Sequence, residues 1–245
     1  MLSFDTIPTP VARTNREGKK LKMSGLARMV LQAMSVKEFN GWNYFLAKGS
    51  KSVGLIVIHE IFGYNKYVES VASQLASSGF TAGAIDLFRG KKATSLDEGM
   101  KLRASVTNEL LDDGVSRGME LMRKEAGAKK VGTLGFCMGG GFALQAASDL
   151  GLDFCVDYYG SIPNEGDISG LKGPVLLILG SDDDRVTPWA FEKLFPAAKA
   201  HKKRIEVQLY PNAKHAFHRP GWDGHNPEAA RDAWDKTLRF LSQFT

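Results

Sequence analysis

The chain contains 245 residues, of which 43% are hydrophobic and 24% are charged. This balance excludes a disordered chain, a collagen-like repeat and a small disulfide-rich scaffold. The net charge of +5 comes mainly from basic residues in 13–28 and 199–204, and we predict no nucleic-acid partner because no aromatic side chains interleave with them. No apolar run is long enough for a membrane span. With only two cysteines, Cys137 and Cys155, we expect a reduced, cytoplasmic protein.

Residues 1–35 stand apart from the rest of the chain. Pro8, Pro10 and the basic stretch after them predict an irregular arm. A short amphipathic helix is expected next, with its apolar stripe formed by Leu26, Met29, Val30, Ala33 and Met34. This helix could dock on its own molecule, form a dimer contact or cover an active site, so we expect either a monomer or a homodimer. The remaining residues, 36–245, are predicted to form one domain.

Strand-like apolar runs alternate with helical patterns along this domain. The predicted strands are residues 53–59, 81–85, 130–135, 153–159, 174–180 and 204–210. Helical stripes are formed by Val68, Val71, Ala72 and Leu75, and near the C-terminus by Trp234, Leu238 and Leu241. This alternation predicts an α/β fold with a mainly parallel central sheet and helices on both faces.

The segment Gly135-Phe136-Cys137-Met138-Gly139 joins a predicted strand to a predicted helix. It has the pattern of a nucleophile elbow, G-x-S-x-G, with cysteine in place of serine. The glycines are required because a side chain two residues before or after the nucleophile would collide with the neighbouring backbone. The helix N-terminus would favour a thiolate at Cys137, and the Met138 N–H could bind an oxyanion. The alternative is a buried cysteine behind a packing turn.

Candidate partners for Cys137 follow later strands. Three carboxylates, Asp182, Asp183 and Asp184, come directly after strand 174–180, and His215 comes after the last strand. This is the chain order nucleophile, acid, histidine of α/β-hydrolases. A single loop aspartate or histidine is ordinary, but the three parts in this order predict a catalytic triad.

Glu60 lies at the tip of the predicted strand 53–59. Its position after five apolar residues should desolvate the carboxylate and raise its pKa. His59 should point to the opposite face because side chains alternate along a strand. We therefore expect Glu60 to face Cys137, and the N–H of Ile61 to supply the second oxyanion-hole donor.

Together these motifs resemble the dienelactone hydrolase family over residues 40–245. The resemblance rests on His59-Glu60-Ile61-Phe62-Gly63, Asp86-Leu87-Phe88, Gly135-Phe-Cys137-Met-Gly139-Gly140, Gly180-x-x-Asp183 and His215-Ala-Phe217. It implies an α/β-hydrolase fold and a triad of Cys137, His215 and Asp183. It also implies that Glu60 holds the resting thiol and helps convert it to thiolate. Arg219 and Arg89 match the neighbourhoods from which the family draws arginines for the substrate carboxylate.

The function implied by the resemblance is cleavage of a small, anionic enol lactone such as dienelactone, a carboxymethylenebutenolidase activity, through an acyl-enzyme and without a cofactor. We expect no metal, because His215, His218 and His225 lack a zinc-ligand spacing. Two alternatives remain open. The same site could cleave another small ester or thioester, or the chain could be a non-catalytic binding protein with a hydrolase fold.

Overall fold

The structure is a computed structural model that describes residues 34–162 and 167–245. These residues form one eight-stranded sheet in the order β1-β2-β4-β3-β5-β6-β7-β8. The pairs β1–β2 and β2–β4 are antiparallel, and all other neighbours are parallel. The strands are β1 (Met34–Phe39), β2 (Trp42–Ala47), β3 (Val53–Ile58), β4 (Thr81–Ile85), β5 (Lys130–Phe136), β6 (Cys155–Tyr158), β7 (Val175–Gly180) and β8 (Ile205–Tyr210).

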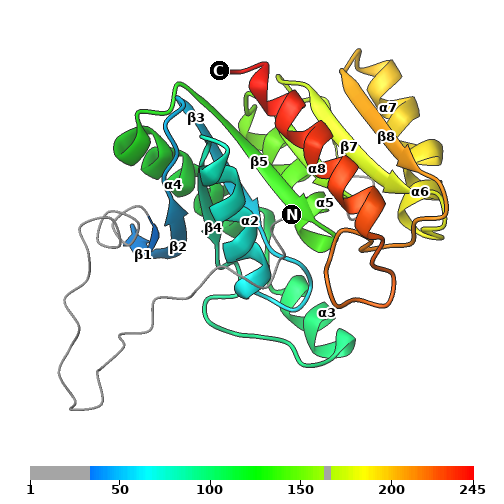
Figure 1. The fold of residues 1–245 in the computed structure, drawn as a ribbon, viewed down its shortest axis with the longest axis horizontal. Helices are drawn as coiled ribbons and strands as arrows, with labels where there is room; N and C mark the ends of the chain where they lie inside the picture. Colours follow the sequence, from blue (N-terminus) through cyan, green and yellow to red (C-terminus); the bar gives the residue numbers. More distant parts are fainter. Residues whose placement is uncertain (1–33, 163–166) are drawn as a thin grey trace.

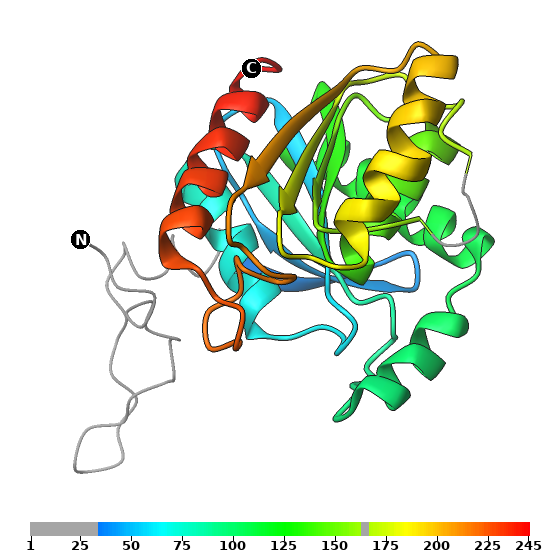
Figure 2. The same ribbon diagram turned by 90° about the vertical axis from the view of Figure 1, so that its right-hand side faces the viewer.

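Helices cover both faces of this sheet (Figures 1 and 2). One face carries α2 and α8, and the other carries α4, α5 and the continuous run α6, η2 and α7. The helical segments are α2 (Lys66–Ser77), α3 (Leu96–Ala104), α4 (Asn108–Ala126), α5 (Met138–Leu150), α6 (Val186–Trp189), η2 (Ala190–Leu194), α7 (Phe195–Ala200) and α8 (Pro227–Ser242).

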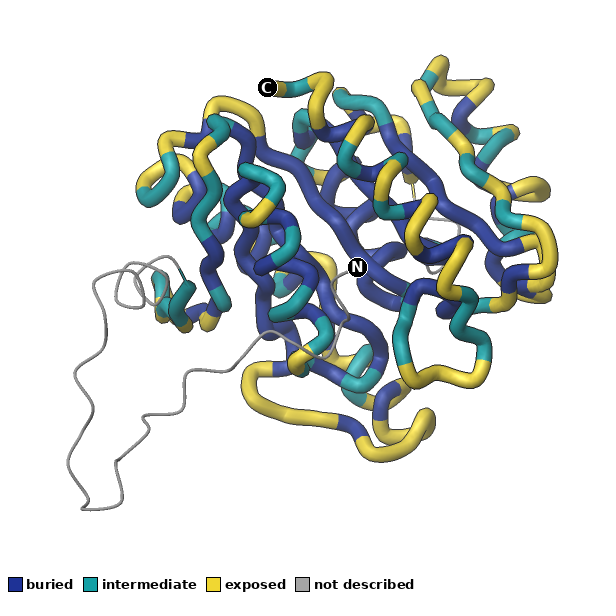
Figure 3. The backbone as a smooth tube through the Cα atoms, in the orientation of Figure 1, coloured by how far each residue is buried: buried dark blue, intermediate teal, exposed yellow. Residues whose placement is uncertain are grey.

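Strand β3 shows why the sequence adopts this layered arrangement. All six of its residues are buried. Leu55 and Val57 pack with α2 and α8, whereas Ile56 and Ile58 pack with α4 and α5. A continuous apolar run is therefore what a parallel strand covered on both faces requires. Figure 3 shows the same pattern, with the central strands buried and exposed residues on the outer sides of the helices. The predicted α/β fold with a mainly parallel sheet is confirmed.

The hairpin of β1 and β2 was not among the predicted strands. It closes through Asn40 and Gly41, whose φ angles are 50° and 81°. Positive φ at both central residues is the requirement of a type I′ turn, for which Asn-Gly is the strongest sequence signal. Met34, expected at the end of an amphipathic helix, instead opens β1, so the sheet begins two residues before the expected boundary. The rest of that expected helix lies outside the described residues.

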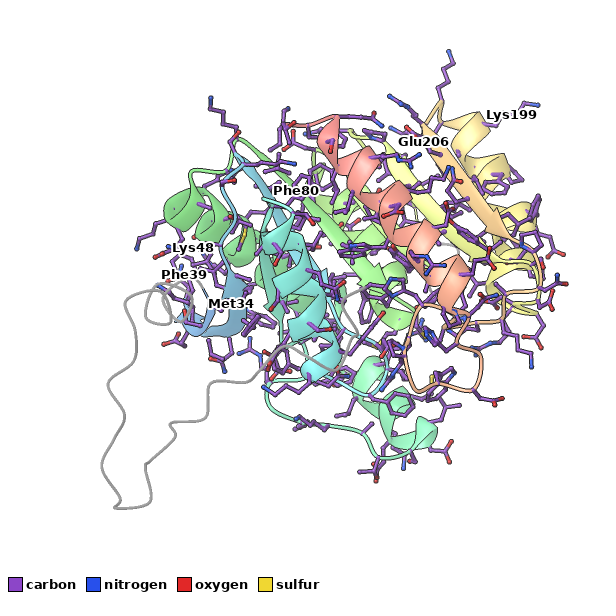
Figure 4. The ribbon with its side chains drawn as sticks, in the orientation of Figure 1. Met34, Phe39, Lys48, Phe80, Lys199 and Glu206 are labelled. Carbon is purple, nitrogen blue, oxygen red and sulfur yellow. The ribbon has the colours of Figure 1, made fainter. Side chains whose placement is uncertain are left out.

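Ion pairs tie this hairpin to α4. Glu125 accepts hydrogen bonds from Lys48 at 2.8 Å and from Lys37 at 3.4 Å. Figure 4 labels Lys48 together with Met34 and Phe39, the two ends of β1. Because these side chains are partly exposed, each pair contributes at most about 1 kcal/mol. The hairpin thus extends the sheet at the edge remote from β8.

Candidate active site

The candidate residues gather at one edge of the sheet. Glu60 follows β3, Cys137 follows β5, Asp183 follows β7 and His215 follows β8. These strands are parallel members of one sheet, so their carboxyl ends open onto the same side, where α/β sheets place their sites. The topology thus brings together residues that lie up to 155 positions apart in the chain.

Cys137 occupies a strained turn between β5 and α5. Its φ of 54° and ψ of −120° are unusual for any residue other than glycine. A Cβ atom on Gly135 would lie 1.9 Å from the carbonyl oxygen of Gly139, and one on Gly139 would lie 2.4 Å from that of Ile58. Both glycines are therefore necessary for the turn, as the elbow pattern requires. The turn leaves the cysteine side chain partly exposed at the sheet edge.

His215 bridges Cys137 and Asp183. Its Nε2 lies 3.0 Å from the cysteine Sγ, and its Nδ1 lies 2.6 Å from Asp183 Oδ2. Asp183 is 2% exposed, while Asp182 and Asp184 are exposed. Of the three neighbouring aspartates, the structure thus brings Asp183 to the imidazole.

Backbone hydrogen bonds hold the two loops of this contact in register. The Ser181 N–H donates to the carbonyl of Tyr210 at 2.9 Å, and the Asp182 N–H donates to that of Ala213 at 3.0 Å. Gly180 makes the approach possible, since a Cβ there would lie 2.2 Å from the Ala213 oxygen. The acid and the histidine are therefore fixed relative to each other by main-chain contacts as well as by their own bond.

The protonation equilibria of this pair follow from burial and hydrogen bonding. Burial would raise the pKa of Asp183, but bonds from His215 and from the Val186 and Arg185 N–H groups outweigh it and lower the pKa. Burial would lower the pKa of His215, but its bonds to Asp183 and Cys137 raise it to about 9. These contacts make the imidazole a stronger base that can take the proton of the Cys137 thiol, while its carboxylate partner stays ionised.

Glu60 is buried, as expected for its strand-tip position. Burial raises its pKa to about 7, although the positive charges of Arg219 and His215 oppose the shift. Its carboxylate bonds the Arg219 guanidinium at 2.5 Å, whereas the Cys137 sulfur bonds His215. The contact between Glu60 and the resting thiol that the family resemblance implies is not among the hydrogen bonds of this structure. His59 turns its Nδ1 to the Glu60 carbonyl at 2.7 Å and its ring edge to Phe88.

The two candidate arginines occupy different surroundings. The Arg219 guanidinium lies between two aromatic rings, 5.5 Å from the centroid of Phe62 and 5.3 Å from that of Trp222. Arg89 is exposed, stacks on Trp42 at 4.0 Å and donates to the Gly41 carbonyl at 3.0 Å. Arg219 is therefore joined to the Glu60 cluster, and Arg89 is held by the β1–β2 hairpin.

The two candidate oxyanion donors are the backbone N–H groups that directly follow Glu60 and Cys137 in the chain. Ile61 directly follows Glu60 and is 7% exposed, and Met138 is the first residue of α5. The first N–H groups of a helix have no acceptor within it, so the Met138 N–H is free of helical pairing. The N–H groups at the N-terminus of α5 carry a partial positive charge, which would stabilise a negatively charged oxygen beside Cys137.

Several residues beside the site were not predicted from the sequence. Tyr159, the residue after β6, is fully buried with its ring edge against His215, the centroids 5.2 Å apart. Tyr67 of α2 bonds His218 Nδ1 at 2.7 Å. A buried aromatic residue in a sequence is interpreted as core, and only the packing shows that Tyr159 contacts His215 and that Tyr67 contacts His218.

The described residues were also searched for cavities, metal-ligand groups and membrane-spanning helices. A cavity of about 240 Å³ is lined by the hairpin residues Val36, Asn43, Tyr44 and Phe45 together with Tyr64 and Asp86. Within residues 34–162 and 167–245, no three His, Cys, Asp or Glu side chains are grouped as metal ligands. Across the same ranges, no helix has the length and apolar character needed to cross a membrane.

A mainly parallel sheet with a strained strand-to-helix elbow defines an α/β-hydrolase. The family model for the dienelactone hydrolase family matches residues 43–245. A Saccharolobus solfataricus protein named "Putative carboxymethylenebutenolidase" is 31% identical over 77% of this chain and 88% of its own. A Bradyrhizobium protein named "Probable 2-oxo-3-(5-oxofuran-2-ylidene)propanoate lactonase" is 31% identical over 76% of this chain and 82% of its own.

Solved structures share the fold. The dienelactone hydrolase-like promiscuous phosphotriesterase P91 from metagenomic libraries superimposes with a TM-score of 0.73 at 22% identity, covering 86% of this chain and 99% of that one. The chain belongs to the dienelactone hydrolase family. It is a hydrolase of the carboxymethylenebutenolidase-like class, which acts on ester and lactone bonds.

Proposed function

We propose that this hydrolase opens a small enol lactone bearing a carboxylate, with Cys137 as the nucleophile. The observation that carries the proposal is the line of contacts Sγ–Nε2 at 3.0 Å and Nδ1–Oδ2 at 2.6 Å through Cys137, His215 and Asp183. This is the arrangement of nucleophile, base and orienting acid. The left-handed backbone of Cys137 supports it, since strain of this kind is retained at functional turns.

The proposed reaction begins with transfer of the thiol proton to His215 Nε2. The sulfur then attacks the lactone carbonyl carbon, and the N–H groups of Ile61 and Met138 bind the oxyanion, each worth about 3 to 4 kcal/mol in comparable sites. The ring C–O bond breaks, and the departing enol oxygen takes the proton from His215, leaving a thioester. Asp183 keeps the imidazole oriented and stabilises its positive charge.

Water completes the proposed cycle. His215 removes a proton from a water molecule, whose oxygen attacks the thioester carbonyl. The C–S bond then breaks, the sulfur is reprotonated from His215, and a carboxylic acid is released. Hydrolysis in this scheme needs no cofactor.

Arg219 supports the anionic substrate. A guanidinium can hold a carboxylate by two parallel hydrogen bonds, and here it is 23% exposed on its side chain and flanked by Phe62 and Trp222. A substrate carboxylate would compete with Glu60 for this guanidinium and release Glu60 toward the thiol. The name of the Bradyrhizobium relative describes a lactone that carries a carboxylate. We do not extend this role to Arg89, whose guanidinium is engaged by Trp42.

A second candidate function uses the same site on a simple carboxylic ester or thioester. It is favoured by the exposed side of Cys137 and by the variety of acyl substrates that one hydrolase fold accepts. A non-catalytic role is the least favoured of the alternatives, because nucleophile, base and acid are in contact.

Hydrolysis of dienelactone and of p-nitrophenyl acetate, measured side by side, tests the proposal. The wild-type protein is compared with Cys137→Ala and with Cys155→Ala, which removes the other free cysteine from its buried place in β6. We expect lactone turnover that Cys155→Ala retains and Cys137→Ala loses. Ester turnover alone would transfer the assignment to the second candidate. Unchanged lactone turnover in Cys137→Ala would refute the cysteine nucleophile.

We also propose that the protein works in the reducing cytoplasm, as a monomer or homodimer. Both cysteines are free, and a proposed thiol nucleophile needs a reduced environment. Size-exclusion chromatography with light scattering would distinguish the two assembly states.

A further inference from the structure

Strand β8 forms an open edge of the sheet. It is the last strand in the sheet order and, among the described strands, it pairs only with β7. Figure 2 views the molecule from this side and shows β8, in orange, between α8 and α7. The register with β7 runs without a bulge from Ile205 to Tyr210. A regular edge strand presents a row of backbone N–H and C=O groups to which another strand can add.

The outward backbone groups of β8 belong to its odd-numbered residues. The carbonyl of Arg204 accepts the Val175 N–H at 3.0 Å, and the carbonyl of Tyr210 accepts the Ser181 N–H at 2.9 Å. Because the backbone direction alternates along a strand, the even-numbered residues of β8 direct their N–H and C=O groups to β7. The groups that face outward are those of Ile205, Val207 and Leu209.

The side chains at these outward positions form an apolar row. Ile205 packs against the core on the face that carries α5 and α7. Since side chains alternate between the faces of a sheet, Val207 and Leu209 point to the same face. Val207 is 37% exposed and Leu209 is 45% exposed. The apolar row is therefore left partly uncovered beside the open edge.

Charged residues are distributed differently over the two edges of the sheet. At the other edge, β1 carries Lys37 and Glu38, and charged side chains are a common protection of edge strands against pairing. Within β8 the single charged residue is Glu206. Its carboxylate is already paired with Arg204 at 2.6 Å. Strand β8 thus lacks the protection that β1 has.

We propose that β8 pairs antiparallel with β8 of a second copy of this chain, about a two-fold axis at Val207. In this register each outward apolar residue meets another, Ile205 against Leu209 and Val207 against Val207 of the second copy. No like charges are directly opposite, because Glu206 meets Gln208. A closed two-fold arrangement is the usual form of a homodimer. The inference does not depend on the proposed reaction.

The sequence of the strand selects this register over its neighbours. An axis at Glu206 would place two carboxylates directly opposite each other, which is unfavourable. An axis at Gln208 would place Ile205 opposite Pro211, which has no N–H to donate to the ladder. The axis at Val207 avoids both faults.

Charge complementarity supports the same axis. The side chain of Arg204 is 64% exposed, and the axis at Val207 places it opposite Tyr210 of the second copy. The Tyr210 hydroxyl donates to Asp232 of α8 at 2.8 Å. The Arg204 guanidinium of each copy therefore approaches an acidic side chain of the other.

Light scattering over a range of protein concentrations tests the pairing. For the wild type we expect a mass that rises toward twice the 26.8 kDa of one chain. Val207→Lys would place two lysines opposite each other at the axis and should raise the dimer dissociation constant at least about tenfold. Val36→Lys is the matched control, because Val36 is 66% exposed on the other edge strand, and it should dimerise as the wild type does. Thermal melting checks that both variants are folded.

Cysteine cross-linking tests the register. Cys137→Ala is the background, so that the partly exposed cysteine takes no part. In a hydrogen-bonded antiparallel pair the two Cα atoms lie about 5.5 Å apart, within the range of a disulfide. Val207→Cys should therefore give a disulfide-linked dimer on oxidation. Leu209→Cys is the control from the same face of the strand, since its two copies lie about 13 Å apart along the ladder, and it should stay monomeric on a gel without reductant.

A wild-type mass that stays monomeric at every concentration would overturn the inference. Equal loss of the dimer in Val36→Lys and Val207→Lys would also overturn it, and so would cross-linking of Leu209→Cys as fast as Val207→Cys, because the contact would then lie elsewhere. None of these measurements uses a substrate. Failure of the proposed lactone hydrolysis would therefore leave them unchanged.

Discussion

Asp157 lies behind the elbow on β6 and should make the stability of the protein depend on pH. It is 0% exposed, its Oδ1 accepts the Gly160 N–H at 2.8 Å, and its Oδ2 has no partner. Burial raises its pKa to about 8, against the opposing effects of that N–H and of His215. The native carboxyl therefore keeps its proton at pH values where the unfolded chain has lost it.

The direction of the effect follows from proton linkage. Below the unfolded pKa of 3.8 both states are protonated, and stability from this group is fully present. Between that value and about 8 the unfolded state alone releases the proton, so stability falls as the pH rises. Each pH unit is worth about 1.36 kcal/mol, so the loss between pH 5 and pH 7 is about 2.7 kcal/mol.

Asp157→Asn removes the titration and keeps an oxygen for Gly160. Urea unfolding at pH 5, 6, 7 and 8 gives the free energy of unfolding of variant and wild type. Other groups titrate alike in both proteins, so the difference between them isolates Asp157. We expect the variant to gain about 2.7 kcal/mol relative to wild type between pH 5 and pH 7.

Asp223→Asn is the matched control, because it makes the same change on an exposed loop residue. Its difference from wild type should stay within about 0.5 kcal/mol at every pH. A pH-independent difference between Asp157→Asn and wild type would refute the reasoning, since it would mean that the buried carboxyl is ionised in the native state.

Three further substitutions test separate parts of the site. Asp183→Asn should lower kcat for p-nitrophenyl acetate by about 10³- to 10⁴-fold because the imidazole loses its charged partner; a loss below tenfold would contradict the orienting role. Arg219→Gln should raise KM for a carboxylate-bearing ester at least about tenfold more than KM for the neutral ester, and equal effects on both would speak against carboxylate binding. Gly139→Ala places a Cβ 2.4 Å from the Ile58 oxygen and should lower the free energy of unfolding by about 2 to 4 kcal/mol in urea, whereas an unchanged midpoint would contradict the packing argument.

The parallel core and the order of the site were readable from the sequence because they depend on local pattern. Strands such as Val53–Ile58 are continuous apolar runs, and glycines two residues on either side of Cys137 are a local steric requirement. The β1–β2 hairpin was missed although Asn40-Gly41 is a strong turn signal. Its first strand is only half buried and lacks the continuous apolar run that marks a central strand such as Val53–Ile58.

Side-chain pairing at the site was not readable in the same way. Arg219 lies 159 residues after Glu60, and the ion pair depends on how the loop between β8 and α8 folds back. Within that loop the Asn226 N–H donates to the Phe217 carbonyl at 2.9 Å, and the Tyr67 hydroxyl of α2 holds the loop at His218. The contact between Tyr67 and His218 joins distant segments, so no periodic pattern in the sequence predicts it.

Buried polar atoms without a hydrogen-bond partner lower the free energy of unfolding, so their positions show where the structure is less stable than it could be. In the described residues, four buried side-chain atoms lack a hydrogen-bond partner, and they belong to His59, Asp112, Asp157 and Tyr159. All but Asp112 lie at the carboxyl ends of β3 and β6, the strands that flank the elbow strand β5. Cys137 and Tyr159 add two left-handed backbone conformations at the same edge. Unpaired buried polar atoms and unfavourable backbone conformations thus occur together at this edge of the sheet. This is the pattern expected where a fold retains strain for function. Removing these costs one at a time should therefore stabilise the protein, and the variants that also slow Cys137 chemistry identify which of the costs serve the reaction.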